Sequence, residues 1–317
     1  MFIDIVSRLL PVFLIIGLGS VLRITKVIGD DMVDGLRTII VNVSLPALLF
    51  LTFMRMEIKA EFIYIILVIF LFCVLLYVIG RLIVRFSGAY RDYIPFLVTG
   101  FEFGMVGTVF FGAAFGLENI SYIAVIDLGQ EIFIWFVYLS LLRFKENPTL
   151  TAKDTVSSFL KSPVIIGVLL GLLFNLLGLQ KTFESGPLGN SVVTTLDYLT
   201  NLTIPLILIV IGHGLRFQRE NLKDMSLFIG FRLIVVLSFA VLIDVVLLRS
   251  ILQLPLMYSA ALYTFVLLPP PFILPLFANS EKEHKALLNN TLVFYSGVSV
   301  ILFSVFFIIF SMYSNIG

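Results

Sequence analysis

The sequence predicts an all-α polytopic membrane protein whose ten transmembrane helices form two inverted repeats of five. Three observations lead to this prediction: the composition, ten apolar windows of spanning length, and proline and glycine patterns that recur at nearly one offset. Of the 317 residues, 60% are hydrophobic and only 13% are charged, and the mean hydropathy is +1.10. Such values are typical of integral membrane proteins. The net charge of +1 gives no reason to expect nucleic acid as a partner.

Ten windows are long enough to cross a bilayer, which takes about 20 apolar residues. They cover residues 9–24, 37–54, 62–86, 93–117 and 120–143, and then 163–180, 194–215, 226–249, 256–279 and 287–313. The first window lacks the small-residue cleavage site of a signal peptide, so we expect a retained helix. The polar stretch between the two sets predicts a first repeat at 1–144, a cytoplasmic linker at 145–162 and a second repeat at 163–317.

Orientation follows from the distribution of Lys and Arg, which favour cytoplasmic loops. Fifteen of these residues lie in the connections after helices 1, 3, 5, 7 and 9, whereas five lie on the other side and Arg232 lies within helix 8. We therefore expect a multi-pass protein of the cell (plasma) membrane, surrounded by the lipid bilayer, with both termini extracytoplasmic.

The two halves share motifs at a constant spacing. Asn42-Val43-Ser44-Leu45-Pro46 in helix 2 matches Asn201-Leu202-Thr203-Ile204-Pro205 in helix 7, 159 residues later, and Pro95 at the start of helix 4 matches Pro255 at the start of helix 9. Matches at nearly one offset indicate an internal repeat. Because each repeat holds an odd number of helices, the second must be inserted upside down relative to the first.

The fourth and ninth windows carry residues that break helices. The fourth contains Glu102 together with Gly100, Gly104, Gly107 and Gly112, and the ninth contains Pro269, Pro270 and Pro271 in a row. No α-helix runs unbroken through three prolines, and an acid at membrane depth is a functional-site hypothesis by default. Discontinuous helices at corresponding positions of inverted repeats indicate a secondary transporter with a site near the midplane. The alternative is that the glycines only allow close helix packing and that Glu102 is merely paired.

The chain resembles the auxin efflux carrier family over essentially its whole length. The resemblance rests on Pro11 to Gly19, Asn42 to Phe50, Gly104-Met105-Val106-Gly107, Asp127, and Leu268-Pro269 with Asn290-Thr291. It implies a scaffold domain of helices 1, 2, 6 and 7, a transport domain of helices 3–5 and 8–10 with helices 4 and 9 crossing, a homodimer formed through the scaffold, and movement of small organic acids. The architecture is shared with the bile acid:sodium symporter group. Glu102 and Val109 depart from the family pattern, where many members have Asn and Pro.

The departure at Glu102 matters because an ionised Glu102 would repel an anionic substrate. Either Glu102 is protonated when the anion is bound, which makes it the proton-coupling residue, or the substrate is neutral or cationic. Asp127 and Glu131 lie on one face of helix 5 and would repel each other, so one holds its proton or pairs with a cation such as Arg232. Asn42 and Asn201 either bind an ion or satisfy backbone groups freed by the nearby prolines. The predicted substrate and ion site comprises Glu102, Gly104, Gly107, Asp127, Glu131, Asn42, Asn201, Pro269, Pro270 and Pro271.

These residues predict a secondary active transporter that moves a small organic acid, or a similar small-molecule substrate, by alternating access, coupled to H⁺ or Na⁺. A ligand-binding membrane sensor that kept the carrier fold is the alternative. An enzyme is not expected, because no Ser-His or Cys-His pair stands at membrane depth. One cysteine and two histidines are too few for a metal site, and no cofactor is predicted.

Overall fold

The computed structural model describes residues 2–83, 93–146, 157, 160–214, 222–272, 274 and 282–314, and for 2–9, 143–146, 282–287 and 289 only the backbone. Within these ranges every regular element is a helix. The all-α prediction is therefore confirmed for the described part of the chain.

The first half contains helical segments at each of the five predicted windows. They are α1 (Phe2–Ile24); α2 (Asp30–Ile39), the π-helix η1 (Ile40–Ser44) and α3 (Leu45–Arg55) in one run; α4 (Phe62–Ile83); α5 (Ile94–Val98), η3 (Phe103–Gly107) and α6 (Thr108–Phe115); and η4 (Leu117–Asn119), α7 (Ile120–Phe133), η5 (Ile134–Tyr138) and α8 (Leu139–Glu146). The π-helix η1 has a local cause: Pro46 donates no backbone hydrogen bond, and just before it the Leu45 amide bonds to Ile40 O, five residues back.

The second half follows the predicted windows with two differences. Its segments are α10 (Pro163–Leu176), α11 (Leu179–Ser185), α12 (Pro187–Gly214), α13 (Leu222–Leu242) with η6 (Ile243–Ile251), α14 (Leu256–Val266) and α16 (Lys282–Ser314). The predicted helix at 163–180 is too long, because the chain bends by 98° between α10 and α11 at Gly178, whose φ of +65° favours glycine. The next helix starts at Pro187, ahead of the predicted 194, because proline is favoured in a first helical turn.

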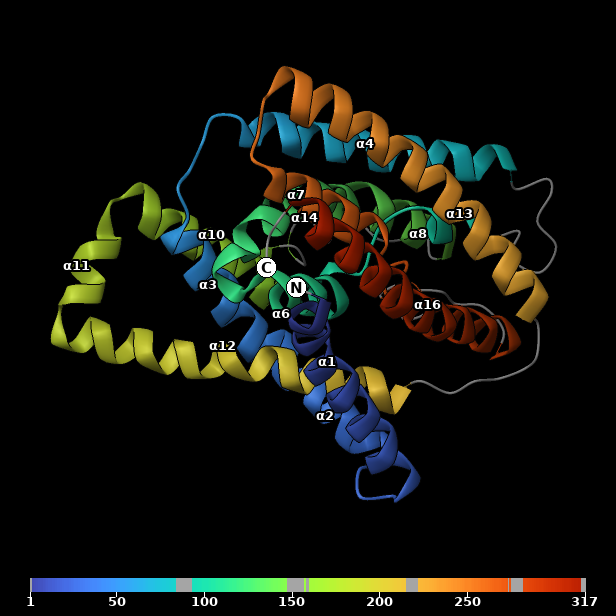
Figure 1. Ribbon diagram of the computed structural model, residues 1–317, viewed down its shortest axis with the longest axis horizontal. Helices are drawn as coiled ribbons and strands as arrows, with labels where there is room; N and C mark the ends of the chain where they lie inside the picture. The colour runs from blue at the N-terminus through green and yellow to red at the C-terminus, as the bar shows by residue number, and fades with distance from the viewer. Residues whose placement is uncertain are drawn as a thin grey trace.

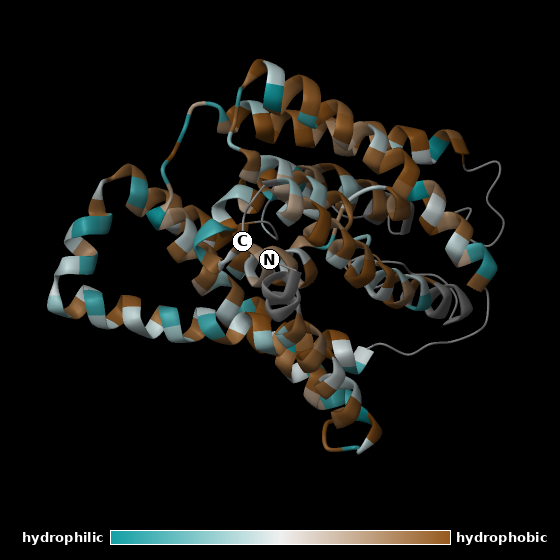
Figure 2. Cartoon of the chain, viewed as in Figure 1, coloured by the Kyte–Doolittle hydropathy of each residue, from teal (hydrophilic) through white to brown (hydrophobic). Residues whose placement is uncertain are grey.

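Seven described segments are long and apolar enough to cross a membrane. They are Asp30–Arg55, Phe62–Ile83, Ile94–Phe115, Leu117–Leu142, Pro187–Gly214, Leu222–Ile251 and Asn290–Tyr313. The bent pair α10 and α11 reaches the same length and apolarity when its two helices are counted as one span. Shorter apolar helices at Leu10–Ile24 and Leu256–Val266 lie in the first and ninth windows. Hydrophobic residues make up most of α4 and α13 (Figure 2), and many of their apolar side chains are exposed, among them Ile63, Leu82 and Ile234. The protein is therefore a multi-pass membrane protein.

The broken fourth window is the centre of the molecule. In an apolar 18-residue stretch of Ile94–Phe115, 89% of the residues are buried, against 33% for the corresponding stretch of Phe62–Ile83 and 28% for that of Leu222–Ile251. Its second half, α6, lies near the middle of the view in Figure 1, with other helices around it. A window whose glycines disfavour a continuous helix is thus the one that the rest of the protein surrounds.

Helices of the two halves pack closely on one side of the molecule. α10 packs along α3, and α1 packs along α12, with α11 joining α10 to α12 at the left of Figure 1. A Cβ atom on Gly167 would lie 2.6 Å from Pro46 O, so only glycine allows α10 to approach α3 this closely. These contacts join the helices expected to form the scaffold domain, whereas the division into scaffold and transport domains stays a prediction. The predicted linker at 145–162 lies mostly outside the described residues.

Candidate substrate and ion site at two helix breaks

The predicted break in the fourth window is confirmed at residues 99–102. α5 ends at Val98, the chain runs extended from Thr99, and the helix resumes at Phe103. Gly100 has φ +77°, and a Cβ atom there would lie 2.7 Å from Pro271 Cγ. Both the backbone conformation and the space therefore require glycine.

The ninth window is broken at its three prolines. α14 ends at Val266, and Pro269, Pro270 and Pro271 follow without helical structure, all of them buried. Their missing N–H groups explain why the helix stops. A turn then forms, in which the Leu274 amide donates to Pro271 O over 3.2 Å. Pro275, the fourth proline of this window, lies outside the described residues.

Glu102 connects the two breaks. Its backbone N–H donates to Pro269 O over 2.8 Å. Its carboxyl group accepts from two backbone amides, with Oε1 3.3 Å from Met105 N in the resumed helix of the first break and Oε2 2.7 Å from Phe272 N after the prolines of the second. The side chain is half-buried. One carboxyl group therefore occupies amide donors from both broken segments.

Gln130 on α7 holds the first break in its extended form. Its Oε1 accepts from Phe101 N over 2.6 Å, and its Nε2 donates to Phe101 O over 2.7 Å, so the side-chain amide replaces both hydrogen bonds that a helix would give Phe101. The same Nε2 lies 3.1 Å from Asp127 Oδ1. Sequence reasoning missed Gln130. The available signal was its place three residues after Asp127 on a buried helix face.

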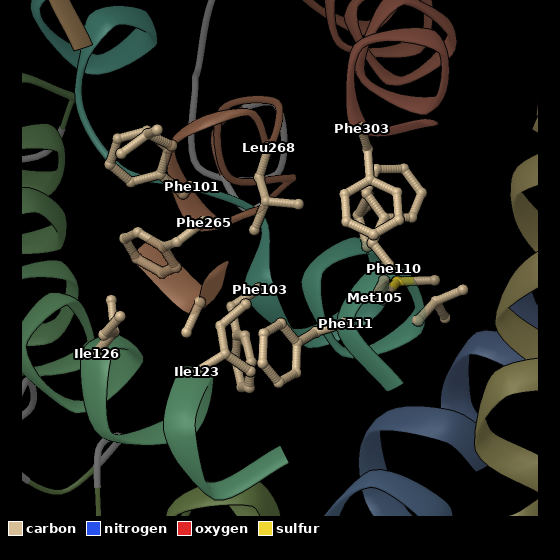
Figure 3. Packing of buried hydrophobic residues seen from close by; sticks show 14 of the residues in the cluster. Phe101, Phe103, Met105, Phe110, Phe111, Ile123, Ile126, Phe265, Leu268 and Phe303 are labelled. Atoms are coloured by element: carbon tan, nitrogen blue, oxygen red, sulfur yellow. The ribbon is translucent and has the colours of Figure 1, made fainter. Parts of the chain in front are cut away.

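Aromatic rings surround the backbone of the breaks. The Phe101 ring lies 4.7 Å from the Phe265 ring between centroids, and the Phe110 ring lies 4.8 Å from the Phe303 ring. Figure 3 shows these side chains with Leu268 above Phe103. A Cβ atom on Gly107 would lie 2.7 Å from Leu268 Cδ1, so Gly107 lets the second break approach the first, as the packing alternative proposed. Gly104 is half-buried, and a Cβ atom there would lie 3.3 Å from Leu45 Cδ2, which would have to move slightly to accommodate it.

Asp127 and Glu131 lie on α7 as predicted but use different partners. Asp127 is buried and accepts from Gln130, whereas half-buried Glu131 accepts from Trp135 Nε1 over 2.8 Å. The suggested pairing of either acid with Arg232 is wrong. Arg232 is fully buried on α13, and in the described part of the chain it donates to backbone carbonyl groups and the Tyr295 hydroxyl group. Open carbonyl groups at the two breaks thus supply three of the four acceptors that its guanidinium group uses.

Asn42 and Asn201 do not join this group. Asn42 is exposed, and its Nδ2 donates to Thr38 O over 2.8 Å. Asn201 lines a separate cavity of about 370 Å³ whose walls come from α3, α12 and the start of α7. Asn42 thus satisfies a backbone carbonyl group that Pro46 does not free, so both of its predicted roles stay predictions.

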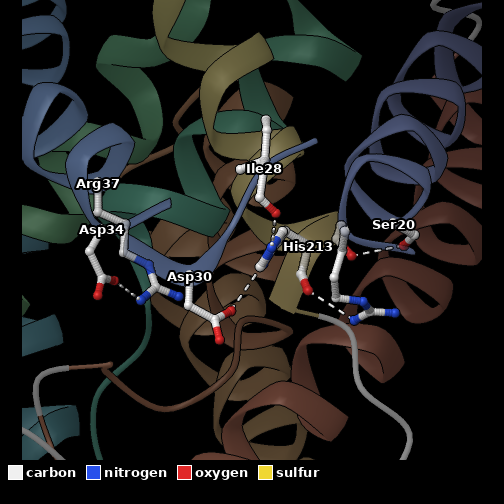
Figure 4. A network of polar contacts seen from close by, with 8 residues as sticks. Ser20, Ile28, Asp30, Asp34, Arg37 and His213 are labelled. Atoms are coloured by element: carbon white, nitrogen blue, oxygen red, sulfur yellow. Dashed lines mark hydrogen bonds and ion pairs between the residues drawn. The ribbon is translucent and has the colours of Figure 1, made fainter. Parts of the chain in front are cut away.

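His213, at the end of α12, belongs to a structural network away from the breaks. Its Nε2 lies 3.1 Å from Ile28 O, its backbone oxygen accepts from Arg23 over 2.9 Å, and Ser20 Oγ donates to Gly212 O (Figure 4). These contacts fix the end of α12 against α1 and the loop after it.

Comparisons with known proteins find similarity to membrane transport proteins. The family model described as "Membrane transport protein" matches residues 4–309. An uncharacterized transporter of Methanothermobacter thermautotrophicus is 26% identical over 241 residues, which are 74% of this chain and 76% of the relative.

Proposed function

Because the chain belongs to the auxin efflux carrier-like membrane transport family, we propose that this membrane transporter is a secondary active transporter with its site at the two helix breaks. It moves a small organic acid by alternating access, driven by a gradient of H⁺ or Na⁺. Helices 4 and 9 cross at the breaks, and the site faces each side of the membrane in turn.

One observation supports the site above all others: the Glu102 carboxyl group accepts from Met105 N and Phe272 N, one amide from each broken segment. Backbone N–H groups at a helix start are donors for anions. Met105 lies in the first turn of a helix that runs from Phe103 to Phe115. The donors that would hold the carboxylate group of a substrate are therefore occupied by an internal carboxyl group.

This competition provides a coupling mechanism. A substrate anion reaches the two amides only when Glu102 withdraws, and a withdrawn Glu102 next to an anion is favoured in its protonated form. One proton then enters with one substrate. Asp127, linked through Gln130 to the first break, is the second candidate for the proton.

The proposed architecture consists of ten helices in two inverted repeats, with both termini outside the cytoplasm of a plasma-membrane protein that dimerises through helices 1, 2, 6 and 7. The helical segments lie at all ten predicted windows, which supports this reading. With ten spanning helices, the loops after odd-numbered helices share one side of the membrane, and the excess of Lys and Arg in these loops assigns that side to the cytoplasm.

Cysteine labelling tests this topology. The native Cys73 is fully buried and gives little background. Cysteines at the exposed positions Asp30 and Glu118 should label from opposite sides in intact cells, with position 118 reached by an impermeant reagent from outside and position 30 only after the membrane is opened. Labelling of a cysteine at Ser314 from the cytoplasm would contradict the assignment.

Transport itself is tested by flux into proteoliposomes with a panel of small organic anions and cations under imposed pH or Na⁺ gradients. We expect accumulation of at least one organic anion that is abolished when the ion gradient is collapsed. Tight binding of a ligand without any flux would favour the alternative of a membrane sensor.

A further inference from the structure

Arg232 carries a buried charge that no carboxylate group balances within the described part of the chain. Its side chain is fully buried. Its hydrogen bonds run from Nε to Val98 O (3.3 Å), from one terminal nitrogen to Leu268 O (2.9 Å) and the Tyr295 hydroxyl group (2.6 Å), and from the other to Gly100 O (2.6 Å). A buried cation is costly unless its surroundings compensate it.

The compensating groups have a common origin. Val98 O is at the end of α5, Gly100 O is in the break that follows, and Leu268 O lies two residues beyond the end of α14. Carbonyl groups at and after helix ends lack intrahelical donors and carry partial negative charge. The guanidinium carbon also lies 4.7 Å from the ring centroid of Phe101 and 4.9 Å from that of Tyr295, at distances where aromatic faces attract a cation.

Carbonyl oxygens of broken helices, in a site closed to water, form the environment in which transporters hold a coupling Na⁺. Here the side chain of the protein itself provides the positive charge. We propose that Arg232 is a resident cation, permanently occupying the position between the two breaks where a coupling Na⁺ would otherwise bind. This proposal rests on the proposed function for the location of the site, and it decides the coupling ion. A tethered cation cannot be released, so the coupling falls to protons.

Chemical rescue tests the proposal on the full-length protein in lipid nanodiscs without substrate. Arg232→Ala removes the donors of three carbonyl groups and should lower the melting temperature by roughly 5 to 10 °C. Millimolar guanidinium chloride, compared with choline chloride, should restore part of this loss. Arg249→Ala is the matched control, because Arg249 is half-exposed and contacts Asp244 and Ser259. It should show no rescue, and a folded Arg232→Ala protein that guanidinium does not stabilise would overturn the proposal.

A second pair of variants applies if Arg232→Ala does not fold. Arg232→Lys keeps the charge, whereas Arg232→Met keeps the length and leaves the same carbonyl groups without a donor. We expect the lysine variant to melt higher than the methionine variant, and the opposite order would show that Arg232 only fills space.

The wild-type protein provides a third measurement. Its melting temperature should be equal in NaCl and in choline chloride at the same ionic strength, and a saturable rise with Na⁺ would contradict a resident cation. Since these melting experiments use no substrate, they can fail or succeed independently of the flux measurements that test the transport function.

Discussion

Glu102→Gln should abolish accumulation of substrate driven by a pH gradient while leaving substrate binding intact. Glutamine has the size of the acid but carries no exchangeable charge. Its amide has one acceptor oxygen, so it can occupy only one of the two amides that Glu102 now engages, Met105 N or Phe272 N. The freed donor favours an anionic substrate, so we expect binding that is tighter and less dependent on pH. Exchange of substrate for substrate should persist, because that half of the cycle needs no deprotonation.

The matched control is Glu118→Gln, which changes an exposed acid in η4 outside the breaks and should leave uphill transport unchanged. Flux and exchange in proteoliposomes, together with binding measured over a range of pH, distinguish the outcomes. If Glu102→Gln accumulates substrate with the pH response of the wild type, Glu102 has only a structural role. Asp127 then becomes the candidate for binding the coupling proton.

Gln130→Leu should be the most damaging change away from the acid itself. It preserves the approximate size of the side chain but removes the acceptor of the buried Phe101 N–H group, the donor to Asp127, and one of the two donors to Phe101 O, which keeps its bond from Phe103 N. Each buried group left without a partner costs about 1 to 3 kcal/mol. We expect a lower melting temperature and a loss of both binding and flux, because the extended form of residues 99–102 positions the Glu102 carboxyl group.

Gln180→Leu is the control for this change, since Gln180 lies in α11 and, among the described residues, its side chain forms one long hydrogen bond, 3.4 Å to Glu184 Oε2. Its melting temperature and flux should stay near those of the wild type. A Gln130→Leu protein with unchanged flux would show that residues 99–102 keep their extended conformation without the hydrogen bonds between Gln130 and the Phe101 backbone.

The sequence predicted the breaks correctly because their causes are local. Closely spaced glycines make a helix easy to unwind, and three successive prolines stop a helix whatever surrounds them. The positions of the helices that contain these breaks were also predicted from hydropathy. The bend at Gly178 was missed because one glycine in an apolar stretch is compatible with a continuous helix, and only the packing of α10 and α12 against α3 requires the turn.

The partners of the breaks were not predictable, because they come from distant parts of the chain. Gln130 is 29 residues from Phe101, and Arg232 is 132 residues from Gly100. Charge pairing suggested that Arg232 would meet Asp127 or Glu131, yet open carbonyl groups at helix ends compete for the same donors. The pattern of charges in a sequence does not show which backbone groups a break leaves open.

Proton uptake during substrate binding is the most direct test of coupling through Glu102. The measurement adds a transported organic anion to purified protein in weakly buffered solution and follows the pH. If the anion displaces Glu102 from Met105 N and Phe272 N and Glu102 takes up a proton, the wild type should absorb about one proton per bound substrate, and Glu102→Gln none. Binding without proton uptake in the wild type, or equal uptake in the two proteins, would contradict the mechanism.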